Sequence, residues 1–164
     1  MPFELEQQLE DQWCWAAVTL AVERYFSPAS TLSQCQIAEA VLPGVNQCCN
    51  NRAGCNRPQK LQDALDKFSR LKVIVPDVLP FDMVRAEIDA RRPVCVRIGW
   101  PGGTGHFVII RGYRLLASGM QLVDVVDPLF DDAMIFYDDL KSAYQNAEVP
   151  GGGGQWTATF LVNE

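Results

Sequence analysis

The chain has 164 residues and a formal net charge of −6, with one histidine and six cysteines. This length suits a single domain with a real hydrophobic core, and we expect residues 1–164 to form one. The acidic balance lacks the basic surface that nucleic acids require, and no apolar run approaches the ~20 residues that span a bilayer. We therefore expect no nucleic-acid partner and no membrane segment.

Hydrophobic spacing divides the chain into a helical front half and a stranded back half. The front half is predicted to hold helices at 12–26, 34–42, 58–68 and 80–91 and a short strand at 71–75. The back half is predicted to hold strands at 94–98, 106–113, 121–126, 133–137 and 156–162. We therefore expect an α+β domain, with a helical subregion at about 1–92 and a stranded subregion at about 93–164.

The stretch QWCWAA at 12–17 places a cysteine between two tryptophans at the start of the first predicted helix. Free N–H groups and the helix dipole in that turn favour an anion, so they stabilise the thiolate of Cys14 over its thiol. The thiolate is the nucleophilic form. Position alone also fits a buried cysteine without chemical function, which is common in proteins.

His106 is the only histidine, and it begins a predicted strand directly after the glycine-rich turn PGGTG. Such an imidazole can accept a proton from a thiol and later deliver it to a departing amine. Asp127 follows the strand at 121–126, which Pro128 prevents from continuing, and its carboxylate can orient the imidazole by accepting a ring N–H. Asp124 is the alternative acid, but it lies on the opposite face of that strand.

Gln8 stands six residues before Cys14. Its side-chain amide could share an oxyanion with the backbone N–H of Cys14, a role for which Gln7 and Gln12 are alternatives. A glutamine, a cysteine at a helix start, a histidine at a strand start and an aspartate at a strand end together supply what thiol-based acyl transfer needs. This chemistry uses no cofactor, and we expect no metal site.

A set of motifs runs along the chain: QWCWAA, SQCQIAEAVL, CC, GCN, GHFVIIRGY, VVDPLF and GQWTATF. Together they resemble the bacterial papain-like cysteine proteases over roughly residues 8–162. The chain is similar to a compact branch that includes an exported plant-pathogen effector protease, and to the double-glycine peptidases. The resemblance implies a papain-like fold with its active site in the cleft between the two subregions. It also implies that Cys14 is the nucleophile, His106 the base, Asp127 the orienting acid and Gln8 the oxyanion-hole donor.

Six further residues are expected to line the substrate cleft: Trp13, Trp15, Trp100, Gly103, Gly105 and Trp156. Trp13 and Trp15 replace the glycines that are usual beside the papain cysteine, which leaves the shape of the groove open. Trp100 borders the turn at 101–103, and glycines before a strand let a substrate backbone come close. Trp156 is expected either beside the catalytic imidazole or in the core.

Four cysteines cluster within positions 35–55: Cys35, Cys48, Cys49 and Cys55. Their spacing does not fit the usual zinc pattern, so we expect two disulfides, with reduced cysteines as the alternative. An adjacent Cys48–Cys49 bridge is strained, which leaves two pairings open. These are Cys35–Cys48 with Cys49–Cys55, and Cys35–Cys49 with Cys48–Cys55. Cys95 is expected to be a free cysteine inside the fold.

The leading prediction is a peptidase that acts on a protein or peptide substrate. The alternatives are a thiol acyl transferase or deamidase with the same triad, and a binding module without catalysis. Disulfides indicate an oxidising destination, although the acidic start MPFELE lacks the apolar core of a signal peptide. We therefore expect a secreted or exported monomer, such as an effector or an antibacterial toxin, with an immunity or inhibitor protein as a partner.

Overall fold

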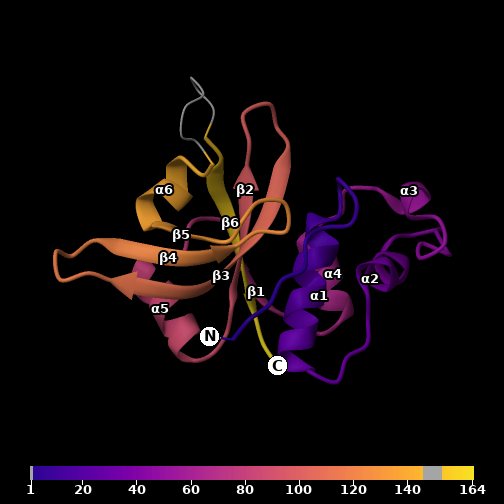
Figure 1. The fold of residues 1–164 in the computed structure, drawn as a ribbon, viewed down its shortest axis with the longest axis horizontal. Helices are drawn as coiled ribbons and strands as arrows, with labels where there is room; N and C mark the ends of the chain where they lie inside the picture. The colour runs from indigo at the N-terminus through magenta and orange to yellow at the C-terminus, as the bar shows by residue number, and fades with distance from the viewer. Residues whose placement is uncertain (1, 146–152) are drawn as a thin grey trace.

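The structure of the chain is a computed structural model, which describes residues 2–145 and 153–164. An antiparallel sheet forms its centre, with the strand order β1-β6-β2-β3-β4-β5 (Figure 1). The strands are β1 Leu71–Val75, β2 Val94–Gly99, β3 Gly105–Leu115, β4 Gln121–Val126, β5 Ala133–Phe136 and β6 Gln155–Val162. The helices are α1 Cys14–Phe26, α2 Gln34–Val41, α3 Arg52–Cys55, α4 Leu61–Lys67, α5 Phe81–Asp89 and α6 Tyr137–Ser142.

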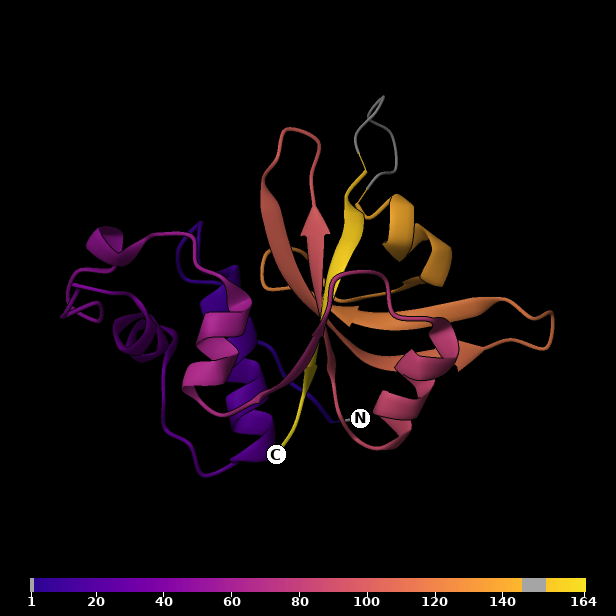
Figure 2. The same ribbon diagram turned by 180° about the vertical axis from the view of Figure 1, so that it is seen from behind.

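Helices cover both faces of the sheet (Figures 1 and 2). On one face α1 and α4 pack against the strands, with α2 and α3 beyond them, and α5 and α6 cover the other face. The side chains of β2 alternate between the two layers: Cys95 belongs to the hydrophobic cluster of α1, whereas Val94 and Val96 belong to the cluster of α5. A strand buried on both faces must place apolar residues on both, which explains the apolar run at 94–96.

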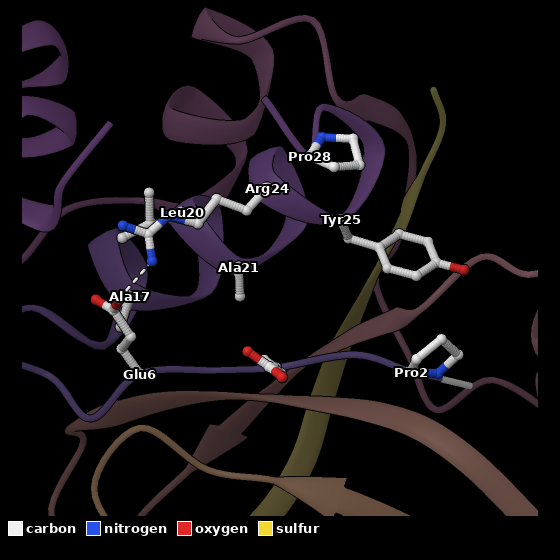
Figure 3. Close-up of a pocket in the computed structure, with 9 residues that line it drawn as sticks. Pro2, Glu6, Ala17, Leu20, Ala21, Arg24, Tyr25 and Pro28 are labelled. Atoms are coloured by element: carbon white, nitrogen blue, oxygen red, sulfur yellow. Dashed lines mark hydrogen bonds and ion pairs between the residues drawn. The ribbon is translucent and has the colours of Figure 1, made fainter. Parts of the chain in front are cut away.

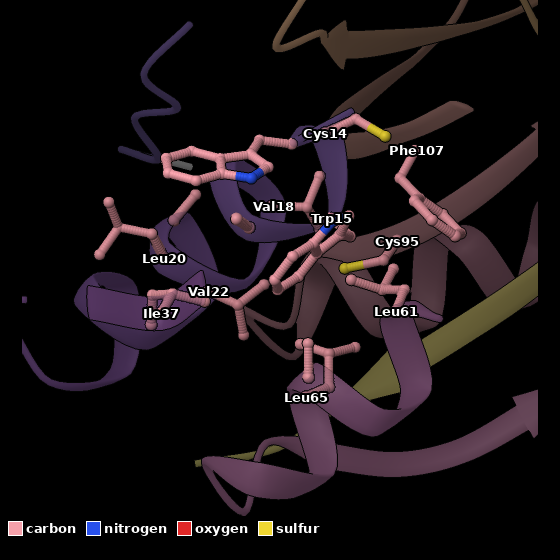
Figure 4. Packing of buried hydrophobic residues seen from close by; sticks show 14 of the residues in the cluster. Cys14, Trp15, Val18, Leu20, Val22, Ile37, Leu61, Leu65, Cys95 and Phe107 are labelled. Atoms are coloured by element: carbon pink, nitrogen blue, oxygen red, sulfur yellow. The ribbon is translucent and has the colours of Figure 1, made fainter. Parts of the chain in front are cut away.

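The helix α1 is the centre of its layer. Every residue from Cys14 to Val22 is buried, because the helix lies between the sheet and the helices α2 and α4. Figure 4 shows Trp15 and Val18 of α1 close to Leu61 of α4 and Cys95 of β2. The predicted helix is therefore confirmed, although it begins two residues later than expected.

Two disulfides staple the loop between α2 and α4: one ties it to α2 and the other lies within the loop. They join Cys35 to Cys49 and Cys48 to Cys55, so the prediction of two disulfides is confirmed and the second of the two pairings is the one formed. Ser33 is the N-cap residue of α2, and its backbone N–H donates to Oε1 of Gln36 at 3.0 Å, as in a capping box. Cys95 is a free, buried cysteine, also as predicted.

The sequence-based elements need three corrections. The strand β1 comes from the predicted helical subregion, yet it pairs with β6 at the edge of the sheet. The short helix α3 was not predicted, because the N-cap bond from the Gly54 N–H to the Asn51 side chain, rather than a hydrophobic period, marks its start. The strand predicted at 133–137 ends one residue early, since Tyr137 begins the unpredicted helix α6.

Candidate active site

Cys14 is the first residue of α1 and is 8% exposed. The N-cap residue Trp13 makes no side-chain hydrogen bond to the helix, so no side chain caps the N–H groups of the first turn at that position. These groups and the helix dipole favour a negative charge at this end of α1. Figure 4 shows the sulfur pointing away from the helix, on the side of Phe107 in β3. The predicted placement of the cysteine at a helix start is therefore confirmed.

His106 and Asp127 come from neighbouring antiparallel strands. His106 is the second residue of β3 and Asp127 follows the last residue of β4, so the start of one strand and the end of the other meet at the same side of the sheet. The His106 Nε2–H donates to Asp127 Oδ1 across 2.7 Å, and the two residues are 4% and 2% exposed. Asp124, the alternative acid, instead accepts from Arg111 Nε at 2.9 Å, which leaves Asp127 as the partner of the imidazole.

Cys14 also acts on the imidazole of His106. Burial by itself lowers the pKa of His106, but the hydrogen bond with Asp127 and the interaction with Cys14 outweigh burial and raise that pKa to about 9. The ring is therefore protonated at neutral pH. An imidazolium beside a cysteine at a helix start is the setting that favours a thiolate.

The carboxylate of Asp127 receives four hydrogen bonds. Its Oδ1 accepts from His106 and from the backbone N–H groups of Leu129 at 2.7 Å and Phe130 at 3.1 Å. Its Oδ2 accepts from the Tyr144 hydroxyl at 2.5 Å. Burial alone raises the pKa of this carboxyl group, but the bonds from His106, Tyr144 and Leu129 lower it below the ordinary value. Asp127 is thus a negative charge that faces the imidazolium.

Gln8 lies on the segment before α1 and is held next to the loop that follows Asp127. Its backbone N–H donates to the Pro128 carbonyl at 2.7 Å. Its side-chain Nε2 donates to the carbonyls of Glu10 at 3.0 Å and Asp11 at 2.9 Å, while its Oε1 is buried without a partner among the described residues. Both amide hydrogens already have acceptors, so an oxyanion role requires the amide to turn away from one carbonyl.

The family model described as papain-like cysteine protease AvrRpt2 matches residues 1–130 of the chain. The chain belongs to this family. The match spans Gln8, Cys14, His106 and Asp127, and the resemblance predicted from the sequence motifs is thereby confirmed. An α+β fold with helices packed on an antiparallel sheet agrees with a papain-like family. No curated protein matches the chain.

The two tryptophans beside Cys14 are interior residues. The prediction that they line the substrate cleft is therefore wrong. Trp13 and Trp15 are 0% and 1% exposed. The indole N–H of Trp13 donates to the Cys55 carbonyl at 2.9 Å, and that of Trp15 donates to the Arg57 carbonyl at 3.0 Å. Both rings therefore attach the start of α1 to the disulfide-bonded loop.

The other predicted cleft residues fall into two groups. Trp156 is 4% exposed, contacts the ring of Tyr137 and donates its indole N–H to Thr159 Oγ1, so it is a core residue on the far face of the sheet. Gly103 and Gly105 are exposed in and beside the turn between β2 and β3, and Trp100 is partly buried there. A Cβ at Gly105 would approach the Arg97 guanidinium to 2.8 Å, a contact that this flexible side chain can relieve by moving.

Sequence reasoning missed two buried polar residues next to the site. Tyr144 bonds to Asp127, but it lies between helix α6 and strand β6 and belongs to no motif. Gln34 is 1% exposed, accepts from the Leu9 N–H at 3.0 Å and donates to the Gln7 carbonyl at 2.7 Å, so it holds the backbone on both sides of Gln8. Its position inside the motif SQCQIAEAVL was the signal available in the sequence.

A separate pocket lies between the N-terminal segment and α1, and Cys14, His106 and Asp127 are not among its lining residues (Figure 3). Glu6 and Arg24 form an ion pair at its edge, and Leu20 and Tyr25 add apolar walls. Within residues 2–145 and 153–164, no group of three or more His, Cys, Asp or Glu residues could hold a metal ion. In the same residues, no helix is long and apolar enough to cross a membrane.

Proposed function

We propose that this papain-like cysteine protease hydrolyses peptide bonds with Cys14, His106 and Asp127 as its catalytic triad. The observation that carries the proposal is the buried hydrogen bond of the single histidine to Asp127, with a pKa that Asp127 and Cys14 together raise to about 9. A buried imidazolium that contacts both an acid and a cysteine at a helix start has the arrangement of an activated thiol nucleophile. In the proposed mechanism this pair reacts as a thiolate and an imidazolium.

In the proposed reaction the Cys14 thiolate attacks the carbonyl carbon of the scissile peptide bond. The negative charge moves to the carbonyl oxygen, where the Cys14 backbone N–H and a turned Gln8 amide can donate to it. His106 gives its proton to the departing amine as the carbon–nitrogen bond breaks, which leaves an acyl-enzyme thioester. His106 then takes a proton from water, whose oxygen attacks the thioester and releases the acid. Asp127 keeps the imidazole oriented in both steps.

The substrate class that fits this chemistry is a protein or peptide. The same acyl-enzyme could pass its acyl group to an amine, or form on a glutamine side chain and release ammonia, so a transferase or deamidase is the second catalytic candidate. A binding module without catalysis is the third candidate. The set of Gln8, Cys14, His106 and Asp127 argues against it, because binding alone needs no activated thiol.

The proposed setting is an oxidising compartment outside the producing cell. The support is the pair of disulfides around the loop at 45–57, which persist where thiols are not kept reduced. We propose a role as a secreted effector or antibacterial toxin, present as a monomer and matched by an immunity or inhibitor protein. A gene for a small partner that blocks turnover by this chain would support the toxin role over a housekeeping exported protease.

The experiment that tests the function is mass spectrometry of a peptide mixture incubated with the wild type or with Cys14→Ala. We expect new peptide pairs whose masses sum to the parent peptide plus one water, and none with the variant. Products that carry an added amine would favour the transferase, and conversion of glutamine to glutamate would favour the deamidase. The peptidase proposal would be contradicted if the wild type cleaved neither the peptide mixture nor denatured proteins of diverse sequence.

A further inference from the structure

Tyr144 is a buried tyrosine whose hydroxyl points at the acid of the triad. It is 3% exposed, and its O–H donates to Asp127 Oδ2 at 2.5 Å. The other three donors to this carboxylate, from His106, Leu129 and Phe130, all bond to Oδ1. Tyr144 therefore satisfies the oxygen that points away from the imidazole, and a buried charged oxygen without a donor is costly.

The backbone around Tyr144 is fixed from two directions. Its N–H donates to the Gly154 carbonyl at 3.0 Å, and the Gly154 N–H donates back to the Tyr144 carbonyl at 2.9 Å. A Cβ on Gly154 would come within 2.3 Å of Ile98 and 3.0 Å of Trp100, so this bridge requires a glycine. The rings of Trp100 and Tyr144 lie 6.3 Å apart between centroids. The end of α6 and the start of β6 together hold the phenol in place.

We propose that Tyr144 is a positioning residue of the active site, which fixes the rotation of the Asp127 carboxylate so that Oδ1 stays aimed at the His106 ring. This inference rests on the proposed function, because it assigns a role within the same triad. The carboxylate could tilt about Oδ1 and still keep its bonds from the Leu129 and Phe130 N–H groups. The bond from Tyr144 to Oδ2 removes that freedom. The same bond favours the ionised form of a buried carboxylate, which the imidazolium needs as its partner.

The charged and titratable groups around this contact come from three segments. His106 on β3 bonds to Asp127 directly, and Cys14 on α1 acts on His106. Asp132, in the loop after β4, carries a negative charge that acts on Tyr144 and opposes ionisation of the phenol. Burial and Asp127 both raise the pKa of Tyr144 well above its ordinary value, so the hydroxyl keeps its proton and remains a donor over the working pH range.

The test compares Tyr144→Phe with Tyr137→Phe, followed by NMR of the imidazole as pH is lowered. His106 is the only histidine, so its ring signals need no assignment and report protonation of Asp127 as a shift at low pH. Tyr137 is the matched control, because it is also buried and donates to a carbonyl, that of Leu79 at 2.7 Å. Loss of a donor to the charged form raises the pKa of an acid, so we expect this low-pH shift to move up by about one pH unit in Tyr144→Phe alone.

Peptide turnover gives the second reading. We expect kcat to fall about tenfold in Tyr144→Phe with KM nearly unchanged, since the lost contact does not touch substrate. A low-pH shift that is the same in the wild type and in folded Tyr144→Phe would overturn the positioning role. The NMR result stands without turnover, so it separates failure of this inference from failure of the proposed peptidase activity.

A measurement on the wild type covers the case in which Tyr144→Phe does not fold. With ¹³C at the tyrosine Cζ atoms, the Tyr144 signal should shift at the same pH as the low-pH step of His106, because both side chains bond to the one carboxylate. A Tyr144 signal that does not respond at that pH would contradict the inference.

Discussion

The helical layer and the sheet hold their parts of the site in different ways. The proposed nucleophile, Cys14, lies at the start of α1, which two disulfides and the indole bonds of Trp13 and Trp15 attach to the stapled loop. The proposed base lies on β3 and the proposed acid directly follows β4, and their positions depend on the backbone pairing of β2, β3 and β4. Covalent anchors can be removed one at a time, whereas a ladder fails as a unit. The two halves of the triad should therefore respond to different perturbations.

Register explains why the sheet needs no anchor of its own. Ile98 pairs with His106 and Ile109 pairs with Val126, so the positions of His106 and Asp127 are fixed by the pairing of buried neighbours. A slip of one residue would turn every apolar side chain of β3 to the opposite face. The stapled loop has no such register, since its backbone carries one short helix and two disulfides.

The largest expected effect is the loss of turnover when either half of the site loses its reacting group. We expect Cys14→Ala and His106→Ala each to lower kcat/KM by about 10⁴-fold or more, and Asp127→Ala to lower it less. His106→Ala should remain folded, because Asp127 keeps its bonds from Leu129, Phe130 and Tyr144. Circular dichroism checks the fold and peptide hydrolysis checks the rate. Full activity in His106→Ala would refute the triad.

The next effect concerns the disulfides and separates the two regions. Replacement of Cys48 and Cys55 by serine should lower the free energy of unfolding by about 2–4 kcal/mol, measured by urea denaturation without reductant. It should also slow alkylation of Cys14, because the Cys55 carbonyl anchors Trp13. The matched control replaces Cys35 and Cys49, and we expect a similar loss of stability with a smaller change at Cys14. An equal slowing of Cys14 alkylation in both variants would show that the bond from Trp13 to the Cys55 carbonyl has no specific effect on Cys14.

A pH dependence of stability should come from the sheet half. His106 has its pKa raised from 6.5 to about 9, so its contribution is complete below pH 6.5 and is lost as pH rises through 9. Asp127 has its pKa lowered from 3.8, so its contribution is present above pH 3.8 and is lost on further acidification. We expect the free energy of unfolding to fall by about 1–3 kcal/mol between pH 6.5 and 9. A fall of the same size in His106→Ala would assign it to other groups.

The smallest expected effect comes from one indole bond. Trp13→Phe removes the donor to the Cys55 carbonyl and some core volume, and it should lower the free energy of unfolding by about 2 kcal/mol. Trp156→Phe is the control in the other layer, where the indole donates to Thr159. We expect a comparable stability loss from both, with slower alkylation of Cys14 only in Trp13→Phe. Equal alkylation rates would mean that Trp13 contributes packing alone.

Much of this fold could be predicted from the sequence, because the hydrophobic residues recur at regular spacing and the reactive residues are few. The apolar faces of α1, α2 and α5 and the alternation along β6 marked these elements to within a few residues. The single histidine, the helix-start cysteine and the Asp-Pro strand end identified the triad candidates. These residues lie at or near the ends of helices and strands, where the same sequence stretch marks both the boundary of the element and a reactive side chain.

The parts that could not be predicted depend on contacts distant in sequence. Trp13 reads as a surface aromatic until its bond to Cys55, 42 positions away, is seen. Tyr144 belongs to no motif, because a strand and a helix separate it from its partner Asp127 along the chain. The disulfide pairing was also open, since both arrangements satisfied spacing and only the turn around α3 brings Cys48 to Cys55.

The most direct test of the central claim is the alkylation rate of Cys14 against pH, read by peptide mass, in the wild type and in His106→Ala. Cys95 is an internal control, because burial raises the pKa of its thiol well above the ordinary value and it should not react in the folded protein. We expect Cys14 to react rapidly well below pH ~8.5, the value of a free cysteine, and to lose that reactivity without His106. A profile centred near the free value and unchanged in His106→Ala would contradict a thiolate–imidazolium pair.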